Sequence, residues 1–336
     1  MILITSPVFE EHVTPPGHPE RPERAHVFDV IAGDWTAAGG RTIAPRAATV
    51  DELALAHDPG YVQQIMATRG QAVMLDPDTF TSPESVDVAL LAAGAAIQAA
   101  EHAMTQREAA FALVRPPGHH AERDRAMGFC LFINVAVAAA VMLQRGVSRI
   151  AIVDIDVHHG NGTQWIFYDD PRVLYMSTHQ YPFYPGTGAA DEVGTGHGKG
   201  FTVNIPLEAG CTDGDYSFVY RTIVAPVIDQ YTPELVIVSA GYDAHERDPL
   251  AAMRMSAAGY GAIVKIVRDA ALAHGQLALS TEGGYDLAAT RESLEATLIA
   301  VDRSEAALPR SSDAAPRGER AVAAARAALN PYWRGI

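Results

Sequence analysis

Two acidic residues and one histidine in this chain have the types and the spacing of a metal site. Asp156 and His158 are separated by one residue just after an apolar run, and Asp243 follows another such run. If the chain is still extended at 156–158, side chains two positions apart point to the same side. Two carboxylates, one imidazole and an open position describe a catalytic zinc site. The alternative is that these side chains only cap turns, and the clustering of similar loops argues against it.

A tandem pair of histidines and one tyrosine are the next candidates for chemistry. His119 and His120 follow a Pro-Pro-Gly turn, and separate neighbours can hold each ring in a defined tautomer. Tyr285 follows two glycines, which let the backbone approach a ligand closely, so that its hydroxyl can point at a developing oxyanion. Taken alone, the histidines are equally typical of a surface or hydrogen-bonded pair, and Gly-Gly-Tyr is typical of an ordinary turn.

Four polar segments, 115–120, 154–162, 239–243 and 282–286, each follow the carboxyl end of a predicted strand. Seven apolar runs predict strands, and several lack polar alternation, which is typical of burial on both faces. These runs are Met1–Ser6, Ala109–Val114, Arg149–Asp154, Arg172–Ser177, Phe201–Ile205, Leu235–Ala240 and Gln276–Thr281. Helix-like stretches between them include Ser85–Gln106, Phe132–Gln144, Tyr216–Gln230 and Ala257–Ala273. The alternation predicts an α/β fold whose parallel sheet brings the four loops to one pocket at its carboxyl edge.

Composition limits the class of protein. The formal net charge of −15 disfavours nucleic acid and anionic membranes as partners and suits a cationic ligand, although it also serves solubility. The two cysteines, Cys130 and Cys211, form neither a disulfide framework nor a thiolate zinc pair, so we expect a reducing, cytoplasmic setting. No apolar run approaches the roughly 20 residues that span a bilayer, and the first residues resemble a buried strand, so we expect no secretory signal.

We expect one domain over residues 1–336. Its core covers about 1–301, a linker-like segment rich in Ser, Pro, Ala and charge covers 302–318, and the tail 319–336 holds a helix near Glu319–Leu329. Two further segments, HPERPER at 18–24 and the loop at 184–186, can shape the rim of a site or an oligomer contact. The sequence does not choose between these two, so a homo-oligomer stays an open alternative.

Taken in order, the motifs resemble those of the arginase-like histone deacetylase family. They are HPERPER at 18–24, RPPGHHA at 115–121, GFCLFINVA at 128–136, DIDVHHGNGTQ at 154–164, YPFYPGTG at 181–188, SAGYDAHERDPLA at 239–251 and EGGYD at 282–286. The resemblance leaves only about the last 35 residues uncovered. It implies the arginase/deacetylase fold, a single α/β domain with an eight-stranded, mostly parallel sheet flanked by helices.

The resemblance also implies the roles of individual residues. It implies one zinc ion per chain, and the residues that hold it are Asp156, His158 and Asp243. His119 and His120 would be the acid–base pair, and Tyr285 would be the oxyanion donor. A structural potassium ion behind the zinc is common in the family, and its implied residues are Asp154, Asp156, His158, Ser177 and Thr178.

Asn161 separates subgroups of the family. The first class has Asp at this position, so Asn161 resembles the second class and its bacterial relatives, the histone deacetylase-like and acetylpolyamine amidohydrolases. Asp154 would partner His119 and favour its charged form. A neutral Asn161 would leave His120 less basic and easier to keep unprotonated, as a general base needs.

The substrate implied by the resemblance is an acetylated amine on a slender chain. Gly128, Phe129 and Tyr184 match positions that wall a narrow channel in the family, although plain core packing is the alternative for the two aromatic residues. Leu250 matches a rim position that is acidic in polyamine-selective members, so it favours acetyl-lysine over an acetylpolyamine. Asp78 is expected to hold the substrate backbone at the rim, with a turn or helix cap as the alternative.

Two rival functions use the same features. Arginase and agmatinase share the fold and bind two manganese ions, but their Gly-Gly-Asp-His and Asp-Ala-His-x-Asp motifs are missing here. A catalytically silent module that binds acyl ligands would be expected to have lost a metal ligand or the tyrosine. This chain keeps both, so the sequence favours a deacetylase.

Overall fold

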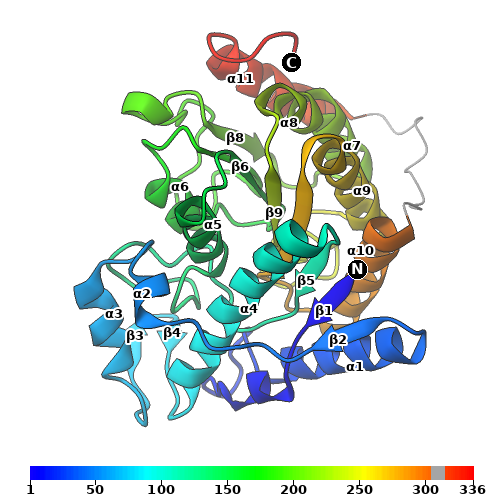
Figure 1. The fold of residues 1–336 in the computed structure, drawn as a ribbon. Coiled ribbons are helices and arrows are strands. Elements are labelled where there is room, and N and C mark those ends of the chain that lie inside the picture. The colour runs from blue at the N-terminus through cyan, green and yellow to red at the C-terminus, as the bar shows by residue number, and fades with distance from the viewer. Residues whose placement is uncertain (304–314) are drawn as a thin grey trace.

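The computed structural model describes residues 1–303 and 315–336, and its centre is a sheet of eight strands (Figure 1). The strands are β1 (Ile2–Ile4), β2 (Arg41–Ile43), β5 (Ala110–Ala112), β6 (Ile150–Asp154), β7 (Val173–Gln180), β8 (Thr202–Leu207), β9 (Leu235–Ala240) and β10 (Gln276–Thr281). Their order is β2-β1-β5-β10-β9-β6-β7-β8, and every neighbouring pair is parallel. The predicted α/β fold is therefore confirmed. A separate antiparallel hairpin consists of β3 (Met74–Asp76) and β4 (Thr79–Phe80).

Helices cover both faces of this sheet (Figure 1). They are α1 (Glu23–Ala37), α2 (Val50–Leu53), α3 (Pro59–Met66), α4 (Ser85–Gln106), α5 (Asn134–Gln144), α6 (Asn161–Ile166), α7 (Asp213–Val219), α8 (Ala225–Tyr231), α9 (Ala257–His274), α10 (Leu287–Arg303) and α11 (Pro316–Leu329). Short turns are η1 (Pro7–Glu11), η2 (Gly196–Gly198) and the π-helical η3 (Tyr220–Val224). None of the helices in the described ranges combines the length and the apolar character needed to cross a bilayer.

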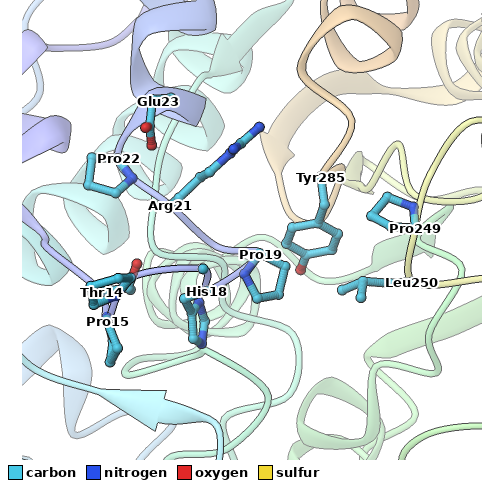
Figure 2. A pocket seen from close by; sticks show the side chains of 12 residues that line it. Thr14, Pro15, His18, Pro19, Arg21, Pro22, Glu23, Pro249, Leu250 and Tyr285 are labelled. Carbon is cyan, nitrogen blue, oxygen red and sulfur yellow. The ribbon is translucent and has the colours of Figure 1, made fainter.

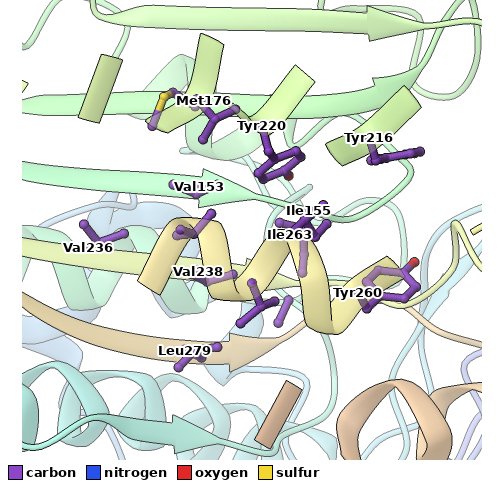
Figure 3. Packing of buried hydrophobic residues seen from close by; sticks show 14 of the residues in the cluster. Val153, Ile155, Met176, Tyr216, Tyr220, Val236, Val238, Tyr260, Ile263 and Leu279 are labelled. Carbon is purple, nitrogen blue, oxygen red and sulfur yellow. The ribbon is translucent and has the colours of Figure 1, made fainter. Parts of the chain in front are cut away.

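The sheet separates two hydrophobic cores, because successive residues of a strand point to opposite faces. Val153 and Val238 pack with aromatic and aliphatic side chains of α7, η3 and α9 on one face (Figure 3). Ile152 and Ile237 pack with α4 and α5 on the other face. Every residue of β6 and β9 is buried, which explains why these runs lack polar alternation.

Several elements differ from the sequence prediction, and three examples have clear physical reasons. β2 was not predicted, because this edge strand has only three residues, Arg41–Ile43, and two of them are exposed. The helix predicted over Tyr216–Gln230 begins at Asp213 and is interrupted by the π-helical turn η3. The last helix begins at Pro316 rather than Glu319, and residues 304–314 of the predicted linker lie outside the described residues.

The last helix is part of the same folded unit as the sheet. Its first backbone N–H groups, those of Arg317 and Gly318, donate to the Asp215 carboxylate of α7 at 3.1 and 2.8 Å. Beyond the helix, the Trp333 indole donates to the Gly200 carbonyl at 2.8 Å, and Trp333 packs in the same core as the strands. The C-terminal segment therefore covers the β8 edge of the sheet.

Candidate active site

Four adjacent strands of the sheet supply the site. β5, β10, β9 and β6 are consecutive in the sheet, and all four are parallel. Their carboxyl ends therefore lie at one edge, and the polar segments 115–120, 282–286, 241–243 and 155–161 follow these ends. The predicted convergence of the four loops is present, as expected for the carboxyl edge of an open α/β sheet.

Asp156, His158 and Asp243 form a buried cluster at this edge, with one ligand atom of each within 4.8 Å of the others. His158 Nδ1 lies 3.2 Å from Asp156 Oδ1 and 3.0 Å from Asp243 Oδ2. The strand β6 ends at Asp154, so Asp156 and His158 stand on the loop after it rather than on extended strand. A loop turn, in place of strand alternation, brings the two side chains together.

The cluster fits a divalent cation. Burial lowers the pKa of His158, but hydrogen bonds and charge from Asp156 and Asp243 outweigh burial and raise it to about 10. The Asp156 and Asp243 carboxylates therefore strongly favour a positive charge next to them. At Gly283, a Cβ atom would lie 2.3 Å from Asp243 Oδ2 and 2.6 Å from Asp156 Oδ2, so only glycine leaves room beside the carboxylates. Two carboxylate oxygens and an imidazole nitrogen are ligands that zinc accepts in catalytic sites.

The tandem histidines have different partners. His119 Nδ1 lies 3.0 Å from Asp154 Oδ2, and His120 Nδ1 lies 2.7 Å from Asn161 Oδ1. Burial lowers the pKa of His119, but the carboxylates of Asp156 and Asp154 raise it well above its ordinary value. Burial and the adjacent His119 lower the pKa of His120 well below its ordinary value. The surroundings thus favour the charged form of His119 and the neutral form of His120, and the two ring centroids lie 4.0 Å apart.

Tyr285 lies beside these groups, on the loop after β10. The backbone N–H of Tyr285 donates to Asp248 Oδ2 at 2.7 Å, and its ring meets the Phe129 ring edge-on at 5.7 Å. The Arg24 guanidinium lies 5.0 Å from the centroid of the same ring. Burial raises the pKa of Tyr285 well above its ordinary value, so the hydroxyl keeps its proton and can donate it in a hydrogen bond.

A narrow channel of about 200 Å³ leads to these side chains. All five residues predicted for the channel line it, and these are Asp78, Gly128, Phe129, Tyr184 and Leu250. Its other lining residues are His120, His158, Phe183 and Tyr285. Phe183 was not predicted, although its ring stacks on His158 at 5.6 Å and it directly precedes Tyr184. Gly128 has φ of +57°, and a Cβ there would lie 2.4 Å from the His120 ring, so the close wall requires glycine.

The residues predicted to bind potassium are only partly brought together. Ser177 is the register partner of Asp154 in the sheet, and its hydroxyl lies 2.9 Å from His179 Nδ1. The Thr178 hydroxyl instead lies 2.9 Å from the Tyr220 hydroxyl. Potassium binding stays a prediction.

Sequence reasoning gave no role to two carboxylates that hold the site together. Glu282 Oε2 accepts hydrogen bonds from the backbone N–H groups of Gly118 and His119, at 2.6 and 3.1 Å. Asp248 accepts from the backbone N–H groups of both Tyr285 and Leu250. Both acids lie inside motifs, EGGYD and ERDPL, so their positions were visible but their backbone partners were not.

Comparison with known proteins gives a consistent picture. A family model described as the histone deacetylase domain matches residues 18–301. The chain is 40% identical over 295 residues to a protein of Archaeoglobus fulgidus named probable deacetylase, across 85% of this chain and 82% of that protein. It is 42% identical over 292 residues to histone deacetylase 15 of Arabidopsis thaliana, across 84% of this chain and 52% of the relative. For histone deacetylase HDA1 of Candida albicans the identity is 39%, across 87% of this chain and 38% of the relative.

A solved structure extends the comparison to the fold. The crystal structure of the HDA15 HD domain superposes with a TM-score of 0.91 and 35% sequence identity, across 99% of this chain and 94% of that one. The chain spans most of its archaeal relative but only about half, or less, of the two eukaryotic relatives. The family match and the shared fold agree with the motifs and with the geometry of the site. The chain belongs to the histone deacetylase family and is a hydrolase of that family.

Proposed function

We propose that this chain is a zinc-dependent deacetylase that removes an acetyl group from the side-chain amine of lysine. One observation carries the proposal: Asp156, His158 and Asp243 converge within 4.8 Å where a channel lined by His120 and Tyr285 ends. Those side chains supply the ligands, the proton acceptor and the oxyanion donor that hydrolysis of an unactivated amide needs.

A zinc ion bound by the three ligands would polarise the acetyl carbonyl and lower the pKa of a water. His120 borders the channel and its surroundings favour the neutral ring, so it is placed to accept the proton of the attacking water. His119 is held in its charged form beside Asp154 and provides the positive charge behind His120. The Tyr285 hydroxyl donates a hydrogen bond to the oxyanion, and His120 then returns a proton to the leaving amine.

The shape of the channel supports a lysine side chain as the leaving group. Phe129, Phe183 and Tyr184 form aromatic walls that fit an apolar methylene stem. Leu250 provides an apolar rim, whereas a polyamine would place a second cationic nitrogen near this position. Asp78 is the carboxylate among the described residues that line the channel, and it is placed to hold the substrate backbone.

Metal content and substrate preference test this proposal directly. We expect one zinc per chain by elemental analysis, loss of activity with a chelator, and recovery on addition of zinc. An acetyl-lysine peptide should be hydrolysed with higher kcat/KM than acetylputrescine or acetylspermidine. His158→Ala should lose zinc and activity, whereas His197→Ala, at an exposed histidine within η2, should keep both. Two manganese ions per chain, or hydrolysis of guanidino substrates, would contradict the proposal.

We also propose a structural potassium ion, from the position of Asp154 and Ser177 on neighbouring strands. We expect thermal stability of the protein to rise with potassium chloride more than with sodium chloride at equal ionic strength. Equal melting temperatures in the two salts would argue against a specific potassium site.

A further inference from the structure

A groove adjoins the mouth of the channel. It has a volume of about 590 Å³ and lies between the loop residues from Thr14 to Glu23 on one side and Pro249 and Leu250 on the other (Figure 2). Leu250 and Tyr285 line both this groove and the channel, so the two spaces adjoin each other at these side chains. A substrate whose side chain fills the channel would therefore extend its remaining atoms into or along the groove.

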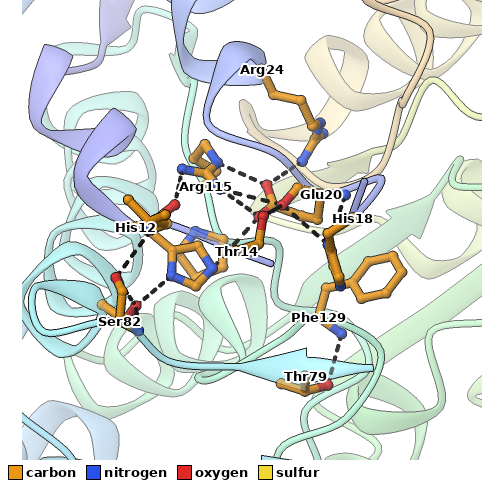
Figure 4. Close-up of polar contacts among 12 residues, drawn as sticks. His12, Thr14, His18, Glu20, Arg24, Thr79, Ser82, Arg115 and Phe129 are labelled. Atoms are coloured by element: carbon orange, nitrogen blue, oxygen red, sulfur yellow. Dashed lines mark hydrogen bonds and ion pairs between the residues drawn. The ribbon is translucent and has the colours of Figure 1, made fainter. Parts of the chain in front are cut away.

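Buried ion pairs and hydrogen bonds hold the loop that lines the groove in one conformation. Glu20, in the loop that lines the groove, is fully buried, and its carboxylate pairs with Arg24 at 2.9 Å and Arg115 at 2.7 Å (Figure 4). Burial raises the pKa of Glu20, but the two guanidiniums outweigh burial and lower it to about 2. The Thr14 hydroxyl donates to the Glu20 carbonyl at 2.8 Å, and His18 Nε2 lies 3.0 Å from the Asp78 carbonyl.

Prolines also restrict this loop, because their fixed φ removes backbone freedom. Four of the residues that line the loop side of the groove are prolines, at positions 15, 16, 19 and 22. A preformed surface loses little conformational entropy when a ligand binds, so modest contacts suffice for recognition. The HPERPER motif thus shapes the rim of the site, which was one of the two roles that the sequence left open.

Arg21 is the residue of this groove that indicates a bound ligand. It is exposed, and within residues 1–303 and 315–336 its guanidinium has no ion-pair or hydrogen-bond partner. Arg24 is three positions further along and is, by contrast, completely buried and paired. Glu23 also lines the groove, but among the described residues no ion pair joins it to Arg21. An unpaired guanidinium in a groove that adjoins the channel is complementary to a carboxylate, which it can bind through two parallel hydrogen bonds.

We propose that this groove is a substrate subsite in which Arg21 recognises a carboxylate carried close to the acetyl-lysine. The inference rests on the proposed deacetylase function and narrows its substrate class to acetyl-lysine compounds with a nearby negative charge. It also disfavours acetylpolyamines, because a second ammonium in the groove would meet the Arg21 cation. The carboxylate can belong to an acidic neighbour in a peptide or to the acetyl-lysine itself.

Matched substrates test the subsite. Capped peptides with Glu before or after the acetyl-lysine are compared with the same peptides carrying Gln, and acetyl-lysine with a free α-carboxylate is compared with its amide. We expect the wild-type protein to prefer the charged member of at least one pair by about 3- to 5-fold in kcat/KM, the size typical of a partly exposed ion pair. The pair that shows the preference identifies the source of the carboxylate.

Variants then assign the preference to Arg21. Arg21→Gln should bring the ratio close to 1, Arg21→Glu should invert it, and Arg21→Lys should retain part of it. Lys199→Gln removes an equal charge from an exposed residue that precedes β8, at the opposite edge of the sheet, and should leave the ratio unchanged. The wild-type ratio should also fall as salt rises, because screening weakens an exposed pair.

Failure of the inference differs from failure of the proposed function. Turnover of the neutral peptides with equal rates for every charged and neutral pair would overturn the subsite and leave the deacetylase function standing. A charge preference that persists in Arg21→Gln would also overturn it. No turnover of any acetyl-lysine compound by the zinc-loaded wild-type protein would instead overturn the function on which the subsite rests.

Discussion

The Tyr285→Phe substitution removes one oxygen atom, and it tests the catalytic role of Tyr285 separately from its structural role. Tyr285 is 7% exposed and lines the channel. Its ring packs against Phe129, and its backbone is held by Asp248. Within the described residues the hydroxyl has no protein hydrogen-bond partner, so Tyr285→Phe breaks no bond of the folded protein. The hydroxyl is therefore free to bind the substrate oxygen, and its loss should be felt only when that oxygen becomes negative.

We expect Tyr285→Phe to lower kcat by about 10²- to 10³-fold, which corresponds to about 3–4 kcal/mol for one oxyanion donor. The free energy of unfolding should change by less than about 0.5 kcal/mol, because the ring and its packing remain. Initial rates with an acetyl-lysine peptide measure the first quantity, and urea unfolding measures the second. Zinc content should equal that of the wild-type protein. Tyr332→Phe, the same chemical change at an exposed site, should have normal kcat.

Two results for Tyr285→Phe would refute the proposed role of its hydroxyl. A kcat within about 3-fold of wild type, with zinc bound, would show that Tyr285 does not stabilise the oxyanion. A large fall in kcat that comes with lost zinc or a lower unfolding midpoint would show that the hydroxyl supports the structure, contrary to the absence of a partner in the described chain.

Two further predictions concern stability. Burial lowers the pKa of His57 from 6.5 to about 4. The neutral ring also accepts from the Ile133 N–H at 3.0 Å, which a protonated ring cannot do. The folded state then binds fewer protons than the unfolded state between these pH values, so stability is lost as pH falls from 6.5 towards 4, by about 3 kcal/mol for this group. Urea unfolding at pH 7 and pH 4 should show a correspondingly smaller loss in His57→Gln, while other buried groups cancel in the difference; equal losses would contradict the assignment. Glu20→Gln should cost about 3–5 kcal/mol, because it leaves the buried Arg115 and a second arginine unpaired, whereas Glu208→Gln in an exposed ion pair should cost less than about 1 kcal/mol. Equal costs for these two substitutions would refute the buried-pair argument.

The parts of this protein that follow from short-range pattern were predictable. β6 and β9 are buried on both faces, so their uniform apolar sequence identified them and the polar loops that follow them. β2 was missed because a three-residue exposed edge strand is defined by its hydrogen bonds to β1 and not by its side chains. The π-helical turn within the predicted Tyr216–Gln230 helix was missed for a related reason, because it depends on backbone register rather than on apolar periodicity.

In the site, too, the types of the residues could be read from the sequence, whereas their contacts could not. Candidate metal ligands could be proposed from Asp156, His158 and Asp243 because carboxylates and imidazoles are suited to a metal wherever they meet. Glu282 was as visible in the sequence, yet its role is to accept two backbone N–H groups of a segment more than 160 positions away. Nothing in the residue types of residues 118–119 marks that contact, because every backbone offers the same donors. Acids that orient a loop by binding its backbone therefore need coordinates, whereas acids that bind a metal show themselves through the other ligands around them.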